Sequence, residues 1–561
     1  MPAMSTSQGL SAEAIRYRLL LAVDHHKAGR AQQVEKLTLE VLASDTQNAH
    51  ALLLLGLACR QQGRIQASIN MIRRAQKARP SDPLVLANLG LALMDQQNNA
   101  EAEQLFLRTL EVNPRQVEAL FGMGGIFFQK NDLDEAEKWL RQTLEVEPEY
   151  ADALNNLAVV VKKKGNREEA LRLFRKAVEL APSNIAFLCN LGENLHESGK
   201  YPEAVATLKR VLEVEPDNVK AKQVLCFACY DLGDLEASKA YCHSALAQDP
   251  EHIVTRFNLC MIKLLEGDYE SGWPEYDLRW KVYPPRKFTQ PQWMGESLEG
   301  KRLLIHAEQG LGDTMQFIRY LELAQGTGAE IHLEVPERLY RLIETIKGPA
   351  KLYKNGEPLP EFDYHSPLLS LPARFHTTLQ TVPARIPYLR TPAEAREKAA
   401  KIAWPQAGLR VGLSWGGSPG RNNDVLRSFQ LSYLEPLFDL EGVNFFSLQM
   451  GPPAAQLEPY KDKIFDLAPF TGDMADTAAQ IEELDLVISV DTSIAHLTGG
   501  LGKPLWVMLS LLPDWRWMLN RSDSVWYPTA RLFRQIRWND WSTVVQDLRQ
   551  ALAEKVAQIS R

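Results

Sequence analysis

Apolar and polar positions in the first half of the chain follow a pattern that repeats every 34 residues. Each period holds an apolar run, a short polar turn and a second amphipathic stretch, which predicts two antiparallel helices per period. A proline recurs between periods, where it would keep one helix from running into the next. These prolines stand at positions 80, 114, 148, 182, 216 and 250.

Small residues recur at block position 8 of the first predicted helix and at block position 20 of the second. The two sets are Gly56, Gly90, Gly124, Ala158, Gly192 and Cys226, and Ser68, Ala102, Ala136, Ala170, Ala204 and Ser238. Small side chains let paired helices approach closely, so that each pair buries its apolar face on the next. The pattern resembles the tetratricopeptide repeat, with six blocks over 49–252, a degenerate block near 15–48 and a final helix pair from 253. We therefore expect an α-solenoid.

Short β-rich runs alternate with helical stretches in the second half of the chain. The runs are 302–306, 330–335, 409–415, 443–449, 484–490 and 505–509, and the helical stretches include 313–326, 336–346, 474–484 and 542–558. Strand and helix in alternation predict parallel sheets covered on both faces. The expected domains are a degenerate cap (1–48), the array with its capping helices (49–285), and two α/β domains (295–390 and 391–561).

Composition limits the class of protein. The net charge of −7 argues against nucleic acid as the main partner, because phosphate binding needs an excess of Lys and Arg. No apolar run reaches the roughly 18 residues of a membrane span, and the N-terminus lacks the order of a signal peptide. These features predict a cytoplasmic protein. Cys226 and Cys229 have the spacing of half a zinc site, but Cys226 and Cys260 occupy the slot that holds Gly or Ala in sister repeats, which favours packing as small buried residues.

Asparagine recurs at block position 6 of four first helices, at Asn88, Asn156, Asn190 and Asn258. An amide offers both a donor and an acceptor, so a row of them on the concave wall would bind an extended peptide. Asparagine at this position would equally serve to tie helices together. Both interpretations stay open from the sequence.

The stretch HAEQGLGDTMQF (306–317) predicts a strand end, a turn and a helix start. Gly310 and Gly312 allow a tight turn with room for a substrate against the backbone. Asp313 falls in the first turn of the helix, where a carboxylate either caps the helix or acts in chemistry.

Two further loops follow predicted strands. In 488–506 a strand ends in Asp491, Thr492 and Ser493, and free N–H groups at the following helix start suit the phosphates of a nucleotide. The glycine-rich turn in 412–429 adds Arg421 and Arg427, whose planar guanidinium groups donate paired hydrogen bonds to phosphate.

Three motifs make a family resemblance specific: GLGD at 310–313, the SWGGS turn from Ser414, and VISVDTSIAHLTGGLGKPLWVML from 487. Together they resemble the heptosyltransferase-like glycosyltransferases of bacteria, which have the GT-B fold of two Rossmann-like domains, and most of all their tetratricopeptide-fused relatives. EQGLGDTMQFIRYL, FDYHSPLLSLP, LLPDWRWML and WYPTARLFRQ also recur in those relatives.

The resemblance implies roles for individual residues. Asp313 would be the catalytic base, and the donor phosphates would lie near Asp491, Thr492 and His496. Ser414 and Ser493, at the same predicted strand ends, are further candidates for donor binding. Arg427 would take the place of a basic phosphate-binding residue, although this chain has Arg instead of Lys there and an inserted RNND before it.

Several other residues are candidates for contact with substrate. They are Glu308, Gln309, Gly310, Gly312, His365, Trp515 and Arg516. Packing is the alternative for His365 and for the aromatic PDWRW segment, whose flat rings suit either a nucleobase or the core.

The expected function is an inverting, metal-independent glycosyltransferase that moves a sugar from a nucleotide donor to Ser or Thr of a protein held in the repeat groove. The resemblance to flagellin-modifying O-glycosyltransferases makes flagellin the best guess for the acceptor. No cofactor is expected beyond the nucleotide sugar, which is the substrate. A D-x-D motif could bind a metal ion, but the one at 132–134 lies in a repeat turn, so no metal is expected at the transfer site. A transferase acting on a lipid or polysaccharide, and a repeat scaffold with an inactive transferase domain, remain as alternatives.

Overall fold

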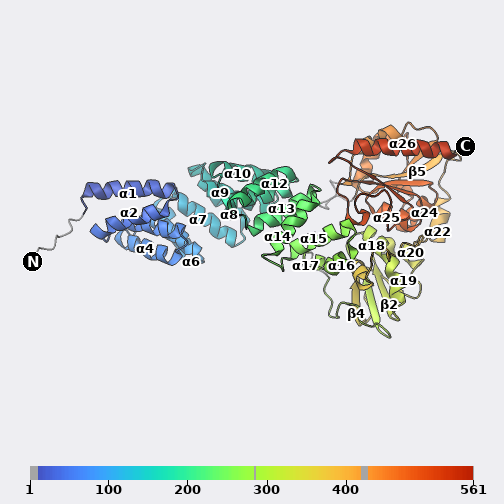
Figure 1. Ribbon diagram of the computed structural model, residues 1–561, viewed down its shortest axis with the longest axis horizontal. Helices are drawn as coiled ribbons and strands as arrows, with labels where there is room; N and C mark the ends of the chain where they lie inside the picture. The colour runs from blue at the N-terminus through green and yellow to red at the C-terminus, as the bar shows by residue number, and fades with distance from the viewer. Residues whose placement is uncertain (1–9, 283–285, 418–426, 560–561) are drawn as a thin grey trace, which may run out of the picture. The chain divides into compact units, whose positions relative to one another are not determined.

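A computed structural model of the chain describes residues 10–282, 286–417 and 427–559 (Figure 1). The chain divides into two compact units, the first ending at Val224 and the second running from Leu225 to Arg561. Unit 1 is helical, and the described strands lie in unit 2.

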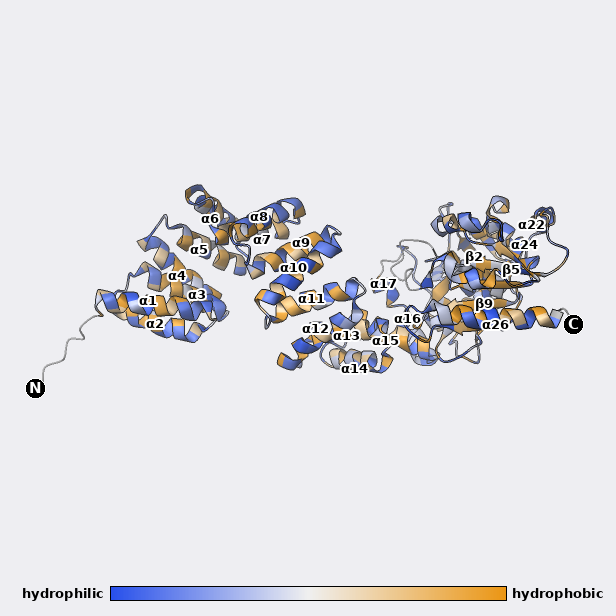
Figure 2. Cartoon of the chain, turned by 90° about the horizontal axis from the view of Figure 1, so that it is seen from above, coloured by the Kyte–Doolittle hydropathy of each residue, from blue (hydrophilic) through white to orange (hydrophobic). Residues whose placement is uncertain are grey.

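Unit 1 is an array of antiparallel helix pairs, as the 34-residue period predicts. Its helices are α1 (Ala12–Lys27), α2 (Ala31–Ser44), α3 (Ala49–Gln61), α4 (Ile65–Ala78), α5 (Pro83–Asp95), α6 (Asn99–Val112), α7 (Val117–Gln129), α8 (Leu133–Val146), α9 (Ala151–Lys163), α10 (Arg167–Leu180), α11 (Ile185–Glu197) and α12 (Tyr201–Val214). Helix α13 (Val219–Asp231) contains the division between the units. The labelled helices of the array carry both hydrophobic and hydrophilic colouring in Figure 2, as expected for helices with one buried face.

Local signals in the sequence set the helix ends. The residue before each of the prolines from Pro80 to Pro216 is a helix C-cap with φ between −138° and −124°, because proline disfavours helical geometry in its predecessor. The second helices of several periods begin at side-chain caps, Asn98, Asp132, Asn166 and Asp234, each accepting a hydrogen bond from the N–H three residues on. Asp132 of the DLD motif is therefore a helix cap.

The glycines at block position 8 sit where paired helices touch. A Cβ added at Gly90 would lie 2.5 Å from the Phe106 ring, and one at Gly192 would lie 2.5 Å from Leu208 Cγ. Gly56 and Gly124 meet Ile72 and Leu140 in the same way. The prediction that small residues here allow close helix packing is confirmed.

Unit 2 contains a four-stranded and a six-stranded sheet, and all the pairings between their strands are parallel. The strands of the first are β1 (Arg302–His306), β2 (Glu330–Val335), β3 (Lys351–Lys354) and β4 (Tyr364–Pro367), in the order β3-β2-β1-β4. Those of the second are β5 (Leu409–Ser414), β6 (Val443–Ser447), β7 (Ile464–Asp466), β8 (Leu486–Val490), β9 (Leu505–Leu509) and β10 (Ala530–Arg534), in the order β10-β9-β8-β5-β6-β7.

Helices cover both faces of the six-stranded sheet. Ile488 and Val490 pack with Trp541 and Leu548 of α26 (Trp541–Ile559), whereas Val487 on the opposite face joins the core that holds α24 (Met474–Glu482) and α25 (Ser493–Gly500). Figure 1 shows α26 on one side of this sheet and α24 and α25 on the other. The sequence prediction of parallel sheets is confirmed, and both faces of the six-stranded sheet are covered as expected.

Shorter helices follow the strands of unit 2. They are α18 (Leu311–Phe317), α19 (Leu321–Gln325), α20 (Tyr340–Glu344), α21 (Leu371–Arg374) and α22 (Ala393–Ala399). The single helix predicted over 313–326 is divided by a 3-10 turn at Ile318–Tyr320. The stretch predicted over 336–346 likewise begins as the 3-10 turn Glu337–Leu339 before α20.

The last helix pair packs with the sheets. Unit 2 includes α14 (Leu235–Leu246), α15 (Ile253–Glu266), α16 (Tyr269–Tyr276) and α17 (Arg279–Val282). Tyr269 and Trp273 of α16 are buried against Trp515 and Trp526, and the Tyr269 hydroxyl accepts a hydrogen bond from the Trp526 ring nitrogen at 2.9 Å. Unit 2 therefore begins at Leu225, earlier than the domain boundary near 285 that the change in composition predicted. The aromatic contacts of α16 join the last helices to the sheet region, although the 34-residue pattern groups them with the repeats.

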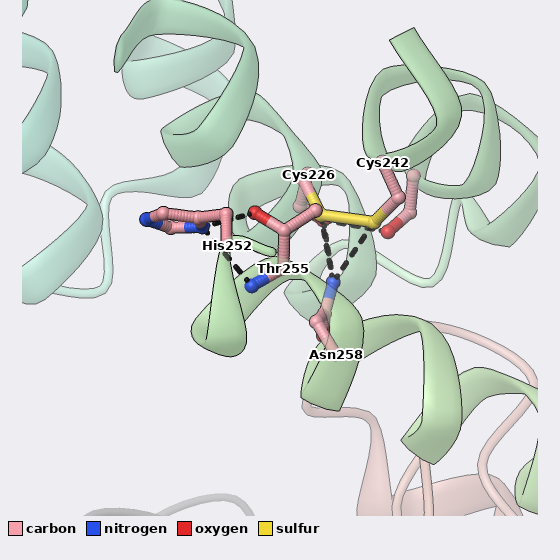
Figure 3. The surroundings of a disulfide bond; sticks show 6 residues. Cys226, Cys242, His252, Thr255 and Asn258 are labelled. Atoms are coloured by element: carbon pink, nitrogen blue, oxygen red, sulfur yellow. Dashed lines mark hydrogen bonds between the residues drawn. A yellow bond between two sulfur atoms is a disulfide. The ribbon is translucent and has the colours of Figure 1, made fainter. Parts of the chain in front are cut away.

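A disulfide between Cys226 and Cys242 joins α13 to α14 (Figure 3). The side-chain nitrogen of Asn258 donates to the Cys226 sulfur at 3.0 Å. The remaining cysteines, Cys59, Cys189, Cys229 and Cys260, are buried and take no part in this disulfide. Cys226 and Cys260 are both buried, as expected of small packed residues, but the sequence analysis did not predict that Cys226 pairs with Cys242, 16 residues away in sequence.

No helix among the described residues is both long enough and apolar enough to cross a bilayer.

Candidate functional site

Asp313 lies where the first sheet gives way to its first helix. Backbone N–H of Gly310 donates to Asp313 Oδ2 at 2.8 Å, so the carboxylate caps α18, which is one of the two roles that the sequence left open. The side chain is buried, with 8% of the residue exposed. Its second oxygen, Oδ1, accepts a hydrogen bond from Arg516 in an ion pair across 203 residues of sequence.

Arg516 uses all three of its nitrogens on neighbouring side chains. It donates to Asp313, to Gln316 Oε1 at 2.5 Å, and to Asp514 Oδ1 at 2.8 Å. Burial disfavours its charge, but the Asp514 and Asp313 carboxylates outweigh burial and raise the pKa of Arg516. The guanidinium is thus a fixed positive charge beside Asp313.

Trp515 takes no part in a substrate surface. Its ring is completely buried between Trp273, Tyr276 and Trp526. Of the two sequence interpretations for the PDWRW segment, the burial of Trp515 favours core packing.

Gly312 brings the two sheets together. A Cβ added at Gly312 would lie 2.6 Å from His496 Cδ2 and 3.5 Å from Ser493 Cα, so α18 packs directly on α25. The sequence assigned this space to a substrate, whereas the structure fills it with the His496 ring. As a result, the loop that follows β1 adjoins the loop that follows β8.

His496 and Asp491 form the centre of the second loop. The ring nitrogen Nδ1 of His496 is 2.8 Å from the Tyr527 hydroxyl, and Nε2 is 3.7 Å from Asp491 Oδ1. Burial lowers the pKa of His496 well below its usual value, so the ring is neutral at pH 7. A neutral imidazole between a carboxylate and a phenol holds both groups in place.

Arg427 adds a second positive charge to this loop. Burial raises the pKa of Asp491 and lowers that of His496, and the charge of Arg427 opposes the first shift and adds to the second. Arg421, the other cation proposed from the sequence, lies outside the described residues.

The hydroxyl-bearing residues are placed at two strand ends. The Thr492 hydroxyl is 3.1 Å from that of Ser489, and Ser493 begins α25. Ser414 ends β5, buried and 3.4 Å from Gln449 Oε1. Gln449, which sequence analysis missed, also accepts hydrogen bonds at 2.9 Å from the N–H groups of Trp415 and Gly416. Its position at the end of the predicted run 443–449 was the available signal.

Glu308 forms an ion pair with Arg279 of α17. It accepts two hydrogen bonds from Arg279, at 2.7 and 3.2 Å, and a third from the N–H of Leu369. Burial raises the pKa of Glu308, and Arg279 opposes that shift. Gln309 lies beside it in the left-handed region, with φ of 57°. The Glu308 contacts indicate a structural role instead of the predicted substrate contact.

His365 lies on β4 against His306 of β1, with Nδ1 and Nε2 of the two rings 3.3 Å apart. Phe288 packs on both rings. Burial lowers the pKa of His306 to about 3 and also lowers the pKa of His365. The neighbouring Glu334 is completely buried, and its Oε1 has no partner among the described residues.

The asparagines of the repeats do not form one continuous row. Asn88 is buried and donates to the Leu84 carbonyl at 2.8 Å, and Asn258 is buried against the disulfide (Figure 3). Asn258 of α15 ties its helix to α13, whereas the Asn88 bond stays within α5. Asn156 and Asn190 are half-buried and line a cavity in unit 1.

The acidity of Asp491 gives a pH-dependent prediction. Burial raises the pKa of Asp491 to about 6, with Asp514 acting in the same direction. The folded protein therefore holds this proton more tightly than the unfolded chain, where the pKa is about 3.9. The contribution of Asp491 to stability is present below about pH 4 and is lost as pH rises through about 6.

We expect the unfolding free energy of the wild type to fall, relative to Asp491→Asn, by on the order of 2 kcal/mol between about pH 4 and about pH 7. Urea unfolding followed by tryptophan fluorescence measures this difference, since eleven of the twelve tryptophans lie at or beyond Trp273. A constant difference between the two proteins over this range would contradict the burial of a charged Asp491.

Comparisons with known proteins identify the repeats. Tetratricopeptide repeat models match residues 19–83, 88–145 and 161–226. Among solved structures, Pseudomonas aeruginosa PilF is 18% identical, covering 37% of this chain and 95% of that chain at a TM-score of 0.34. Cut9 in the APC/C Cut9–Hcn1 complex is 15% identical, covering 44% and 48% at a TM-score of 0.40.

One curated relative is similar over a longer stretch. Protein FlbA of Caulobacter vibrioides is 28% identical over 334 residues, which is 54% of this chain and 55% of that protein. The chain therefore spans about half the length of this relative. The first half of the chain is a tetratricopeptide repeat solenoid, and it is followed by a region of parallel sheets.

Proposed function

We propose that the chain is a metal-independent glycosyltransferase of GT-B architecture that moves a sugar from a nucleotide donor to a protein. The observation that carries the proposal is the packing of α18 on α25 through Gly312 and His496. Ligands of parallel sheets bind beyond the carboxyl ends of the strands. Here two such ends, from two sheets, adjoin, with Asp313 on one side and Asp491 on the other.

The donor would lie against the second sheet. Thr492, Ser493 and the start of α25 offer hydroxyl and N–H donors, and Arg427 offers a cation, which together suit a phosphate. Ser414 stands at the neighbouring strand end, beside the turn that Gln449 holds. Each well-placed donor to the leaving phosphate would contribute about 10²–10³-fold to the rate.

The acceptor hydroxyl would approach Asp313. A carboxylate oxygen has two acceptor positions, so Asp313 keeps capacity for a hydroxyl besides its bonds to Gly310 and Arg516. The hydroxyl proton passes to Asp313 as the oxygen bonds to the anomeric carbon. The bond from that carbon to the phosphate oxygen breaks, and the nucleotide leaves with its electron pair. Attack opposite the leaving group inverts the anomeric centre.

The acceptor is a Ser or Thr hydroxyl in a protein that the repeats recruit, and flagellin is the best candidate from the family resemblance of the sequence motifs. Repeat solenoids present extended binding surfaces, which supports a protein partner.

A second candidate is a repeat scaffold whose α/β region does not catalyse transfer. The burial of Asp313 favours this candidate, as do its hydrogen bonds to Arg516 and Gly310, since both bonds would be needed if Asp313 served only to hold α18 and Arg516 in place.

A donor screen separates the two candidates. A nucleotide sugar at about 100 times its dissociation constant should stabilise the folded protein by about 2.7 kcal/mol, which thermal unfolding detects. The screen covers UDP-, ADP-, GDP- and CMP-linked sugars with the full chain, followed by mass spectrometry of flagellin after incubation with the donor that binds. Stabilisation and a sugar mass on flagellin support the transferase, and a sugar added only to lipid or polysaccharide places the acceptor in another class. No stabilisation by any donor would exclude the enzyme.

A further inference from the structure

Unit 1 contains a cavity of about 510 Å³ among the first helices of consecutive repeats. Apolar side chains from α5, α7 and α9 line it, chiefly Met94, Phe121, Phe128 and Val159. These side chains are half-buried in the folded chain. A cavity of this size lies in the range of about 300–1,000 Å³ typical of pockets that take a ligand.

Gly125 opens the floor of this cavity. The preceding Gly124 is needed for packing, because an added Cβ would lie 2.7 Å from Leu140 Cγ in the paired helix. A Cβ at Gly125 would meet only the flexible end of Met94, at 2.8 Å from Cε. Glycine weakens a helix relative to alanine. Helix packing does not require Gly125, so the space it leaves is a feature of the cavity itself.

The charges at the cavity do not balance. Arg60 and Asp95 pair with each other, with Nε and Oδ2 2.5 Å apart. Asp152 has no hydrogen bond and no ion pair within 4 Å among the described residues. Burial raises the pKa of its carboxyl group, and Arg60 acts against that shift. Asp152 is exposed at the cavity, so its carboxylate is open to a cation from a partner beside the apolar lining.

Three amides line the wall next to Asp152. Asn190 donates to Asn155 at 2.9 Å, and Asn155 donates to Asn156 at 3.2 Å. The side-chain nitrogen of Asn156 donates to none of the described residues. At the other end of this row of hydrogen bonds, the Lys220 ammonium donates to Asn190 Oδ1 at 3.2 Å. The relay therefore ends in an N–H group oriented by its neighbours and available to a carbonyl oxygen.

We propose that this cavity binds an extended peptide segment in which a bulky apolar or aromatic residue stands beside Lys or Arg. The apolar side chain fills the space over Gly125, the cation pairs with Asp152, and a peptide carbonyl accepts from Asn156. The inference rests on the proposed function in taking a protein as the acceptor, and it adds the chemistry by which that protein is selected.

The test measures peptide binding to the full chain without donor, by fluorescence anisotropy. The probe is a fluorescein-labelled Gly-Ser nonapeptide with a central Phe-Lys pair, and its two relatives carry Phe-Glu or Ala-Lys instead. We expect the Phe-Lys probe to bind most tightly, since only this probe satisfies both the apolar floor and the carboxylate.

Three variants locate the binding. Asp152→Asn should weaken the Phe-Lys probe about fivefold, and Asp152→Lys should shift the preference to the Phe-Glu probe. Gly125→Leu should abolish binding while the thermal unfolding midpoint stays the same or rises, because Leu fills the cavity and favours helix. Glu149→Gln is the matched control: it removes the same charge three residues away, at an exposed position outside the cavity lining.

Equal affinity for the three probes, no binding of any probe, or equal effects of Asp152→Asn and Glu149→Gln would overturn the proposal. Dimers that form with rising protein concentration and disappear in Gly125→Leu would assign the cavity to a second copy of the chain and would also overturn it. Asp313→Asn should bind the Phe-Lys probe like the wild type, so that a failure of transfer and a failure of this site are distinguishable.

Discussion

Replacing Asp313 by Asn should slow sugar transfer by about 10²–10⁴-fold, because a general base contributes that much when its carboxylate reaches the attacking hydroxyl. Asn has nearly the same shape and keeps an oxygen for the Gly310 N–H, so the cap on α18 survives. Donor affinity should change little, since the proposed donor site is the loop from Asp491 to His496. The measurement is the initial rate of transfer to the acceptor protein, with donor affinity taken from thermal unfolding of the same preparations.

Asp514→Asn is the matched control for this prediction. Asp514 also accepts a hydrogen bond from Arg516, at 2.8 Å, and its replacement removes the same charge from the same guanidinium. If Asp313 serves only as a counter-ion to Arg516, the two variants should lose similar activity. If Asp313 is the base, only its own replacement should abolish transfer. A folded Asp313→Asn protein that binds donor and transfers sugar at the wild-type rate would refute the assignment.

Replacing Arg279 by Ala should destabilise unit 2 by about 3–5 kcal/mol, the usual cost of removing one partner of a buried ion pair. Arg279 is 1% exposed and bonds Glu308, Asp277 and Ser370, which come from three segments of the chain. Without it, Glu308 would be a buried carboxylate that has lost its cation. Urea unfolding monitored by tryptophan fluorescence measures the loss.

Arg256→Ala is the control for Arg279→Ala. Arg256 also forms a two-bond ion pair, with Glu275 at 2.9 Å, but the side chains are 27% and 31% exposed. Exposed pairs contribute about 1 kcal/mol or less, so this variant should be nearly neutral. The double variant Arg279→Met with Glu308→Leu should recover much of the lost stability, because no charge then remains buried alone. Equal losses from Arg256→Ala and Arg279→Ala would show that burial does not set the strength of these pairs.

The strands that the sequence predicted are the central strands of the two sheets. All six predicted runs became β1, β2, β5, β6, β8 and β9, whereas the missed strands β3, β4, β7 and β10 lie at the sheet edges. A central strand of a parallel sheet is buried on both faces and reads as an apolar run. An edge strand such as KLYK at 351–354 is short and partly exposed, so its composition carries no such signal.

The sequence predicted which loops form the candidate site, but it did not predict which side chains meet there. The strand-to-helix turns at Asp313 and Asp491 follow from local patterns. The pairing of Asp313 with Arg516 joins residues 203 positions apart, and nothing in the two local sequences indicates it. The sequence could not place Gly312 and Trp515 for the same reason, because a tight turn or a flat ring is equally suited to a substrate or to the core.

The sequence by itself determined the helical array, the central strands and the positions where the chain turns from strand to helix. These features depend on residues close together in the chain, where periodicity, caps and prolines act directly. Only the tertiary structure decided that Cys226 meets Cys242, that His496 fills the space beside Gly312, and that Asp152 stands unpaired at a cavity over Gly125. Such contacts depend on how separate helices and strands pack together, and the hydrophobic pattern of a single element does not determine which other element it packs against.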